Sequence, residues 1–322
     1  MKSHVVVVGA GIIGSMVAVK LSDLGAQVTL LDAGFAGQAT RASGGMLAPT
    51  SEALSIPENW REKALQSLHL WQDWLKRFEE MGVDVGYRSG LGHAACSPEE
   101  ALNLKRSGVW LEDHPLHPHG MAYFPQEGSL EPEKVLSALH MLCPVTHAEV
   151  HAIEDQQGLV VRTSLGEIRA DAVILACGVW SAKFGIPVLP KQGQVLLIDG
   201  KHIEHATYKG KGYLVPRGDW TFVGATEIET LDVTPTQGAK NTLLNHVRNH
   251  HPHIPEPQVL EQRVGVRPYL PEPFVGHHPS LKGVLVATGH HRNGVLLAPV
   301  TAQLLAELFM EASPDSYGLP VH

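Results

Sequence analysis

A glycine-rich turn near the start of the chain constrains the fold more than any other feature of the sequence. The β-branched run Val5–Val8 is followed by GAGIIG at residues 9–14 and then by a helical apolar pattern over residues 15–24. Such a run is typical of a parallel strand that is buried on both faces. In a βαβ unit, Gly9 permits the tight turn, Gly11 lets the backbone approach a pyrophosphate, and Gly14 lets the helix pack close to the strand.

An acidic residue completes this unit. A second strand over residues 27–31 ends at Asp32, where a carboxylate can bind ribose hydroxyls. The phosphates would lie at the N-terminus of the helix, where free N–H groups and the helix dipole favour an anion. The unit therefore predicts a dinucleotide site. It does not distinguish NAD from FAD, and Asp32 argues only against a 2′-phosphate.

The remaining pattern predicts two domains that are interleaved in sequence. After a βα region, residues 190–266 become rich in strands, and a strand and helix return over residues 284–310. We expect a turn at Gly166 to join strands at 159–163 and 172–176. The predicted fold is α/β (α+β overall). A Rossmann-type dinucleotide domain would cover residues 1–82, 128–183 and 276–322, and a β-rich substrate domain residues 83–127 and 184–275.

Composition excludes several classes of protein. The 322 residues carry a net charge of -8, which argues against a nucleic-acid surface. The apolar stretch at residues 5–19 is interrupted by glycines and is too short to span a membrane, which needs about 20 residues. Three widely spaced cysteines fit a reducing compartment, so we expect a cytoplasmic protein. The sequence is compatible with a homo-oligomer.

The histidine-rich segment is not expected to bind a metal. His250, His251 and His253 lie in a stretch punctuated by proline, without nearby carboxylate or thiolate partners in sequence. We interpret it as a solvated loop and predict no metal site.

Three further motifs identify a family. Residues 39–47 read ATRASGGML, residues 176–181 read ACGVWS, and residues 288–299 read TGHHRNGVLLAP. With the first glycine motif, they resemble the D-amino acid oxidase family of flavoenzymes, and most specifically its bacterial glycine oxidases associated with thiamine biosynthesis. The resemblance extends over residues 5–308 and implies FAD as the cofactor. Cys177 fits this pattern as a small buried residue without a redox role.

The resemblance also implies which residues contact FAD. The glycine-rich loop over residues 39–47 would pass the pyrophosphate and lie beside the flavin, where small residues let the backbone approach a flat ring. The helix that starts near Val295 would direct its positive end at the flavin. The expected contacts are Gly9, Gly11, Ile12, Ile13, Gly14, Asp32, Ala33, Thr40, Arg41, Gly44, Gly45, Met46, Val150, Gly178, His290, His291, Arg292, Asn293, Gly294, Val295 and Leu296.

Three residues are implied to bind the substrate. Arg267 matches the carboxylate-binding arginine of the family, and a planar guanidinium can hold a carboxylate with two hydrogen bonds. Tyr213 and Arg292 match side chains that also reach the carboxylate. The alternatives are an ordinary strand aromatic for Tyr213 and a surface arginine for Arg292. Lys211 and Glu227 lie nearby in the pattern. They would select a larger or more polar substrate, or else they are solvated charges at strand ends.

The implied reaction is oxidative deamination of a small amino acid, namely glycine, sarcosine or a small D-amino acid. Hydride transfer from the α-carbon to flavin N5 gives an imine, whose hydrolysis yields a 2-oxo acid and ammonia. Molecular oxygen would then be reduced to hydrogen peroxide. One alternative is a D-amino acid or secondary-amine dehydrogenase that passes electrons to another carrier. Others are a nucleotide-binding protein without turnover and an NAD-linked dehydrogenase, which does not need the Arg-Asn-Gly turn.

Overall fold

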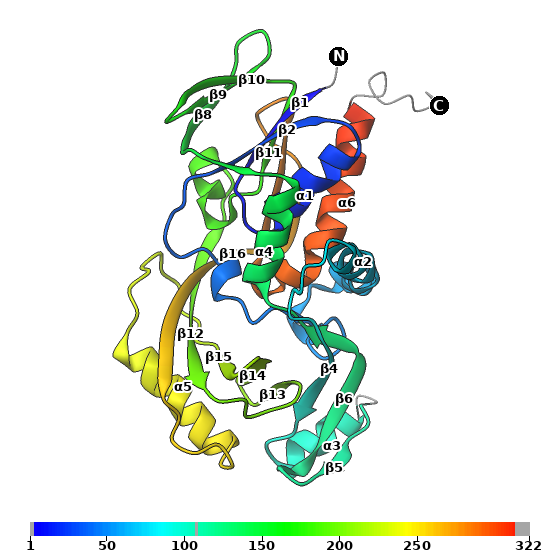
Figure 1. Cartoon of the computed structure of the whole chain (residues 1–322), viewed down its shortest axis with the longest axis vertical. Coiled ribbons are helices and arrows are strands. Elements are labelled where there is room, and N and C mark those ends of the chain that lie inside the picture. The colour runs from blue at the N-terminus through cyan, green and yellow to red at the C-terminus, as the bar shows by residue number, and fades with distance from the viewer. Residues whose placement is uncertain (1–2, 107–108, 313–322) are drawn as a thin grey trace.

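The computed structural model describes residues 3–106 and 109–312 of the chain. Within this part, a 14-stranded mixed sheet extends along the long axis of the molecule, and a separate three-stranded sheet lies near one end of it (Figure 1). Helices cover the large sheet in both its halves. The predicted α/β class, with a Rossmann-type unit next to a β-rich region, is confirmed.

The parallel part of the large sheet holds the glycine-rich turn. Its strands run in the order β17-β11-β1-β2-β7, and every neighbouring pair is parallel. Their bounds are β1 His4–Val8, β2 Gln27–Asp32, β7 Val145–His147, β11 Ala172–Leu175 and β17 Val284–His290. In β1, Val5, Val6 and Val7 have no exposed surface, as expected for a strand covered on both faces.

The helices of this half form its main core. Helix α1 (Ile12–Asp23) packs against α4 (Pro132–Leu142) and α6 (Gly294–Ala312), and α2 (Arg61–Glu80) packs on α6 (Figure 1). Trp71 of α2 is fully buried and donates its indole N–H to the carbonyl of Leu296 at 3.1 Å. The segment 291–311 is apolar enough to cross a membrane, but 67% of its most apolar window is buried inside the fold. It is therefore a core helix.

The other half of the sheet is mostly antiparallel, and the pair of the strands at residues 88–94 and 206–209 is the parallel exception. Strand β16 (Val259–His277) pairs first with β12 and then with β17, so it connects the two halves. The remaining elements of this half are β3 Met46–Leu47, β4 Arg88–Ala94, α3 Pro98–Arg106, β5 Glu112–His114, β6 His117–Ser129, β12 Leu189–Asp199, β13 Ala206–Lys209, β14 Gly212–Arg217, β15 Trp220–Gly224 and α5 Gln237–His250. The small sheet consists of β8 Val150–Asp155, β9 Leu159–Thr163 and β10 Gly166–Ala170.

Two local expectations were wrong. Gly166 does not simply turn the chain between two strands, because residues 166–170 form β10, which pairs antiparallel with β9. The histidine segment is not a solvated loop either, because His250 ends helix α5 and His251 is fully buried. Apolar side chains of α5 anchor this region: Leu243 and Val247 pack against β12, β14 and β15. The division into two interleaved domains stays a prediction.

Candidate functional site

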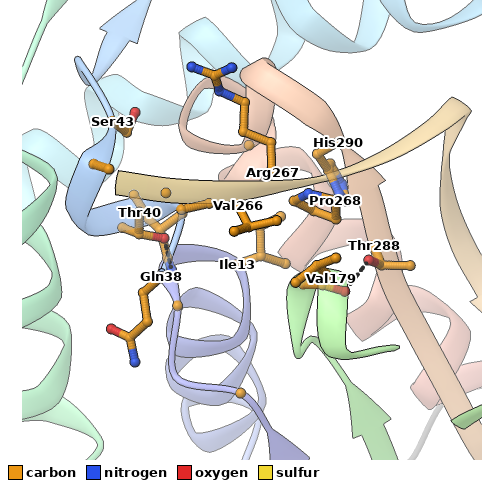
Figure 2. Close-up of a pocket in the computed structure, with 18 of the residues that line it drawn as sticks. Ile13, Gln38, Thr40, Ser43, Val179, Val266, Arg267, Pro268, Thr288 and His290 are labelled. Carbon is orange, nitrogen blue, oxygen red and sulfur yellow. Dashed lines mark hydrogen bonds between the residues drawn. The ribbon is translucent and has the colours of Figure 1, made fainter. Parts of the chain in front are cut away.

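A cavity of about 400 Å³ extends from the parallel strands into the antiparallel half. It lies at the carboxyl edge of the parallel strands, which is where ligands bind in open α/β sheets. The strand ends that line it are Val8 of β1 with Gly9 after it, Leu31 and Asp32 of β2, Ala176 to Gly178 after β11, and Thr288 and His290 of β17. Figure 2 shows Ile13 of α1, Arg267 and Pro268 of β16, and His290 of β17 around this space.

The glycine-rich turn is packed too tightly for any other residue at two positions. Gly9 has a φ of 102°, and a Cβ there would lie 2.5 Å from the carbonyl oxygen of Ala176. A Cβ on Gly14 would lie 1.9 Å from the carbonyl oxygen of Gly9. Both contacts involve backbone, which cannot easily move away. Gly9 therefore makes the turn, and Gly14 lets α1 approach β1 closely.

The start of α1 forms an anion-binding surface at the cavity. Its N-cap residue Gly11 provides no capping side chain, and Gly11, Ile12 and Ile13 all line the cavity. Free N–H groups and the positive end of the dipole favour a phosphate at such a helix start. The N–H of Ile12 donates to the hydroxyl of Thr40 at 3.2 Å, which ties the loop at residues 39–47 to this helix (Figure 2).

Asp32 is held in the cavity wall by backbone donors. Its carboxylate accepts hydrogen bonds from the N–H of Ala10 at 2.8 Å and from the N–H of Gly34 at 2.7 Å. The carboxylate still lines the cavity, as does Val150 of the small sheet. This arrangement suits a ribose and the nucleobase beyond it.

The opposite end of the cavity fits a flat ring system. Gly44, Gly45 and Met46 form one wall, and Gly294 and Val295 at the start of α6 form another. His290, which also lines the cavity, is buried, and its Nδ1 has no hydrogen-bond partner among the described residues. Burial lowers the pKa of His290 to about 3, so its ring is neutral. The α1 surface, Asp32, the glycine wall and the orphaned nitrogen together fit an extended dinucleotide such as FAD.

Arg267 lies at this same end, beside an acidic partner. Its Nη1 lies 3.3 Å from Oε2 of Glu227 and 3.4 Å from the carbonyl oxygen of Thr226. Glu227 also accepts a hydrogen bond from Nε2 of His291 at 2.8 Å. Nε and Nη2 of Arg267 have no hydrogen-bond partner in the described part of the chain, so two of its donors remain for a carboxylate.

The side chains of Arg267 and Tyr213 both pack closely against the backbone of glycine residues. A Cβ on Gly193 would lie 2.2 Å from Nη2 of Arg267. The ring of Tyr213 is enclosed in the same way by Gly44 and Gly224, whose added Cβ atoms would lie 2.7 and 2.2 Å from ring carbons. Burial raises the pKa of Tyr213, although Arg267 and Arg292 oppose the shift, so its hydroxyl stays protonated and can donate a hydrogen bond.

Arg292 is paired within the protein. Its Nη2 forms an ion pair with Oε1 of Glu52, a carboxylate that lines the cavity and is 10% exposed. Burial by itself lowers the pKa of Arg292, but Glu52 and the nearby Tyr208 and Tyr213 outweigh it and raise the pKa overall. Burial, and then Glu52, raise the pKa of Tyr208. Arg292 is thus a cation whose charge is already matched.

The structure brings most of the predicted site residues to this one cavity. Its lining includes Gly9, Gly11, Ile12, Ile13, Asp32, Ala33, Thr40, Gly44, Gly45, Met46, Val150, Gly178, Lys211, Tyr213, Glu227, Arg267, His290, His291, Arg292, Gly294 and Val295. Four predicted contacts lie outside the lining, namely Gly14, Arg41, Asn293 and Leu296.

Sequence reasoning missed Glu52, Gly193 and Gly224. Glu52 lies in a polar loop, where no motif marks it. The two glycines carry a usable signal, since an isolated glycine inside a strand pattern often marks a close approach of another group.

Cys177, which lines the cavity, is not activated as a nucleophile. The pKa of Cys177 is raised to about 11 by burial, so the residue is a thiol, and its Sγ lies 3.6 Å from Oγ of Ser181. Among residues 3–106 and 109–312, no group of three or more His, Cys, Asp or Glu side chains is arranged to hold a metal ion.

Comparison with known proteins gives consistent matches over nearly the whole chain. A model of the FAD dependent oxidoreductase family matches residues 4–308. The glycine oxidase of Geobacillus kaustophilus is 30% identical, with 94% of this chain and 92% of that protein covered. The crystal structure of glycine oxidase from Geobacillus kaustophilus superposes with a TM-score of 0.87 at 27% identity, covering 100% of both chains.

One further relative is longer. The bifunctional protein ThiO/ThiG of Synechocystis sp. is 30% identical over 96% of this chain, but the match covers only 52% of that relative. The chain therefore spans about half the length of the bifunctional protein.

Proposed function

Because the chain belongs to the family of FAD-dependent oxidoreductases, we propose that it oxidises the amine of a small amino acid, with glycine as the first candidate substrate. Family membership confirms the predicted resemblance and FAD as the cofactor. The products from glycine would be glyoxylate, ammonia and, with molecular oxygen as acceptor, hydrogen peroxide. One observation carries the proposal. Arg267 presents two unpaired guanidinium donors in the cavity that fits FAD.

The side chains of this chain bind and orient the substrate. FAD, when bound, would be the two-electron oxidant of the substrate amine, and oxygen would then reoxidise it. Arg267 would hold the substrate carboxylate, and the Tyr213 hydroxyl would donate a second hydrogen bond to it. Holding the α-carbon in one orientation lowers the barrier by restricting the motion of the reactants beforehand.

No side-chain base is assigned to the reaction. His291 is the titratable ring beside Arg267, and its Nε2 is engaged by Glu227. Burial lowers the pKa of His291, although Glu227 opposes the shift. His290 is neutral and is hydrogen-bonded to Thr301 at 3.0 Å. We therefore propose that the amine reacts in its neutral form, without proton transfer to a side chain.

We propose for Arg292 a different role from the one that the family resemblance implies, because it is already paired with Glu52. We propose that it shapes the cavity as a partner of Glu52 and that Arg267 is the principal carboxylate ligand. Glycine oxidases among the relatives support glycine as the first candidate substrate. Sarcosine, D-alanine and D-proline are the next candidates.

The test is a visible spectrum of the FAD-loaded protein, taken before and after glycine is added without oxygen. Loss of the flavin bands on addition of glycine, followed by their return with peroxide formation in air, would establish a glycine oxidase. Bleaching without peroxide on readmission of air would indicate a dehydrogenase that uses another acceptor. A protein that stays yellow with glycine, sarcosine, D-alanine and D-proline would overturn the proposal.

A further inference from the structure

We call the end of the cavity that holds Arg267 and Tyr213 the substrate end. It carries three cations, and two of them lie beside carboxylates. Arg267 lies 3.3 Å from Glu227, and Arg292 is paired with Glu52. Lys211 also lines the cavity, but it forms no ion pair and no side-chain hydrogen bond with any residue of the described chain. Among residues 3–106 and 109–312, it is the cation at this end of the cavity that has no acidic partner.

Lys211 lies close in the fold to the residues around Arg267. Lys211 precedes β14, two residues before Tyr213, and Tyr213 pairs across the sheet with Gly224. Strand β15 ends at Gly224, and the chain that follows it, Ala225, Thr226 and Glu227, also lines the cavity. Thr226 is the residue whose carbonyl contacts Arg267. Lys211 thus lies beside the Arg267 group, on the exposed side of the cavity.

We propose that Lys211 forms a subsite for a second carboxylate, so that the preferred substrate is a dicarboxylic amino acid, with the extra carboxylate on its nitrogen substituent or side chain. This inference rests on the proposed function of the cavity. The first carboxylate pairs with Arg267, and the second with the Lys211 ammonium. Glu227 does not repel it strongly, because the Glu227 carboxylate is held between Arg267 and His291.

A binding experiment tests the subsite separately from catalysis. Diglycolate and ethoxyacetate have the same chain length and lack an oxidisable amine, but only diglycolate has a second carboxylate. Calorimetric titration of the FAD-loaded protein should show that diglycolate binds about fivefold or more tightly than ethoxyacetate, a modest preference because Lys211 is exposed to solvent. The preference should decrease at high salt, since salt screens exposed charges.

Variants assign the preference to one side chain. Lys211→Met should abolish the preference for diglycolate, and Lys211→Arg should retain it. Lys201→Met is the matched control, because Lys201 is an exposed lysine that pairs with Glu204 outside the cavity. In turnover, the ratio of kcat/KM for iminodiacetate to that for N-ethylglycine should fall in Lys211→Met by a similar factor.

The outcomes separate the two proposals. Equal binding of diglycolate and ethoxyacetate, or a preference that survives in Lys211→Met, overturns the subsite even if glycine bleaches the flavin. A preference that depends on Lys211, in a protein whose flavin no amine reduces, supports the subsite and overturns amine oxidation.

Discussion

The guanidinium of Arg292 and the carboxylate of Glu52 form an ion pair at the substrate end of the cavity, although the two residues lie far apart in the sequence. Glu52 comes from the loop before α2, and Arg292 from the turn before α6. The pair therefore connects the loop that follows the glycine-rich wall to the helix whose N-terminus faces the cavity.

Removal of the charge of Glu52 should destabilise the protein. Glu52→Gln leaves Arg292 partly buried without its counter-ion, and loss of one partner of a buried pair is costly. The Arg292 side chain is 38% exposed, so solvent screens part of the effect and we expect a loss of about 1–2 kcal/mol in the free energy of unfolding. Urea unfolding of the FAD-loaded wild type and variant measures this loss in the free energy of unfolding. Glu229→Gln, which breaks the exposed pair with Lys191, should leave the free energy of unfolding nearly unchanged. Equal losses in both variants would show that the Glu52–Arg292 pair contributes no more to the free energy of unfolding than an exposed pair does.

Arg267→Ala should weaken substrate binding without loss of the cofactor. The residue lies at the substrate end, and charge-assisted hydrogen bonds contribute about 1.5–3 kcal/mol each, so KM for glycine should rise about 10- to 100-fold. The flavin absorbance per protein should stay unchanged, since Asp32 and the start of α1 lie at the other end of the cavity. Arg248→Ala provides the control, because Arg248 is an exposed arginine of α5 that pairs with Glu256 outside the cavity. Unchanged glycine kinetics in Arg267→Ala would remove Arg267 from the site.

Gly193→Ala should reproduce part of that defect without removing the arginine. The added Cβ would overlap Nη2 of Arg267, which is the far end of a flexible side chain and can move away. We therefore expect a rise in KM for glycine of about tenfold, from loss of one oriented hydrogen bond, with little change in stability. Gly238→Ala in α5 is the control, because nothing lies within 4 Å of its added Cβ. An unchanged KM would mean that Arg267 binds the substrate from another rotamer.

The cofactor half of the molecule could be predicted from sequence because each of its motifs is local. Residues 9–14 contain their own turn, helix start and close packing, so the sequence shows the geometry directly. The same holds for the turn at residues 288–299, where strand, turn and helix follow one another. Gly166 was misinterpreted because one glycine is typical both of a turn between distant strands and of the first residue of a short strand such as β10.

The substrate half could not be predicted to the same extent, because its contacts form between distant segments. Nothing near Glu52 in the sequence indicates that it pairs with Arg292. The charges of Glu227 and Arg267 could be placed near the site, but their contact depends on the sheet that brings β15 and β16 to either side of β12. His251 appeared solvated because its neighbours are polar and proline-rich, whereas the packing of α5 buries it.

The buried histidines near Lys209 should make the protein sensitive to acid. His251 is fully buried, and both of its ring nitrogens lack hydrogen-bond partners among the described residues. Burial, with additional repulsion from His246, Lys209, His117 and His253, lowers the pKa of His251 to about 3. Lys209 itself lies 3.4 Å from Nδ1 of His117, whose pKa is lowered to about 4, first by burial and then by Lys209.

The sign of the pH effect follows from these shifts. Unfolded histidine takes up a proton near its ordinary pKa of 6.5, whereas folded His251 does so only near 3. The stabilisation is therefore complete above pH 6.5 and is lost as the pH falls toward 3. Between pH 7 and pH 4, His251 alone should lower the free energy of unfolding by about 3 kcal/mol.

His251→Leu removes the titrating ring and keeps an apolar side chain of similar size. Urea unfolding of the FAD-loaded variant should show little loss at pH 7, where the wild-type ring is neutral and unpartnered, and a smaller decline toward pH 4 than in the wild type. His151→Leu, at an exposed position of β8, should leave the acid profile unchanged. A His251→Leu variant that declines as steeply as the wild type would assign the acid sensitivity to other groups, and His117 and His246 are the next to replace, since the pKa of each is lowered to about 4 chiefly by burial.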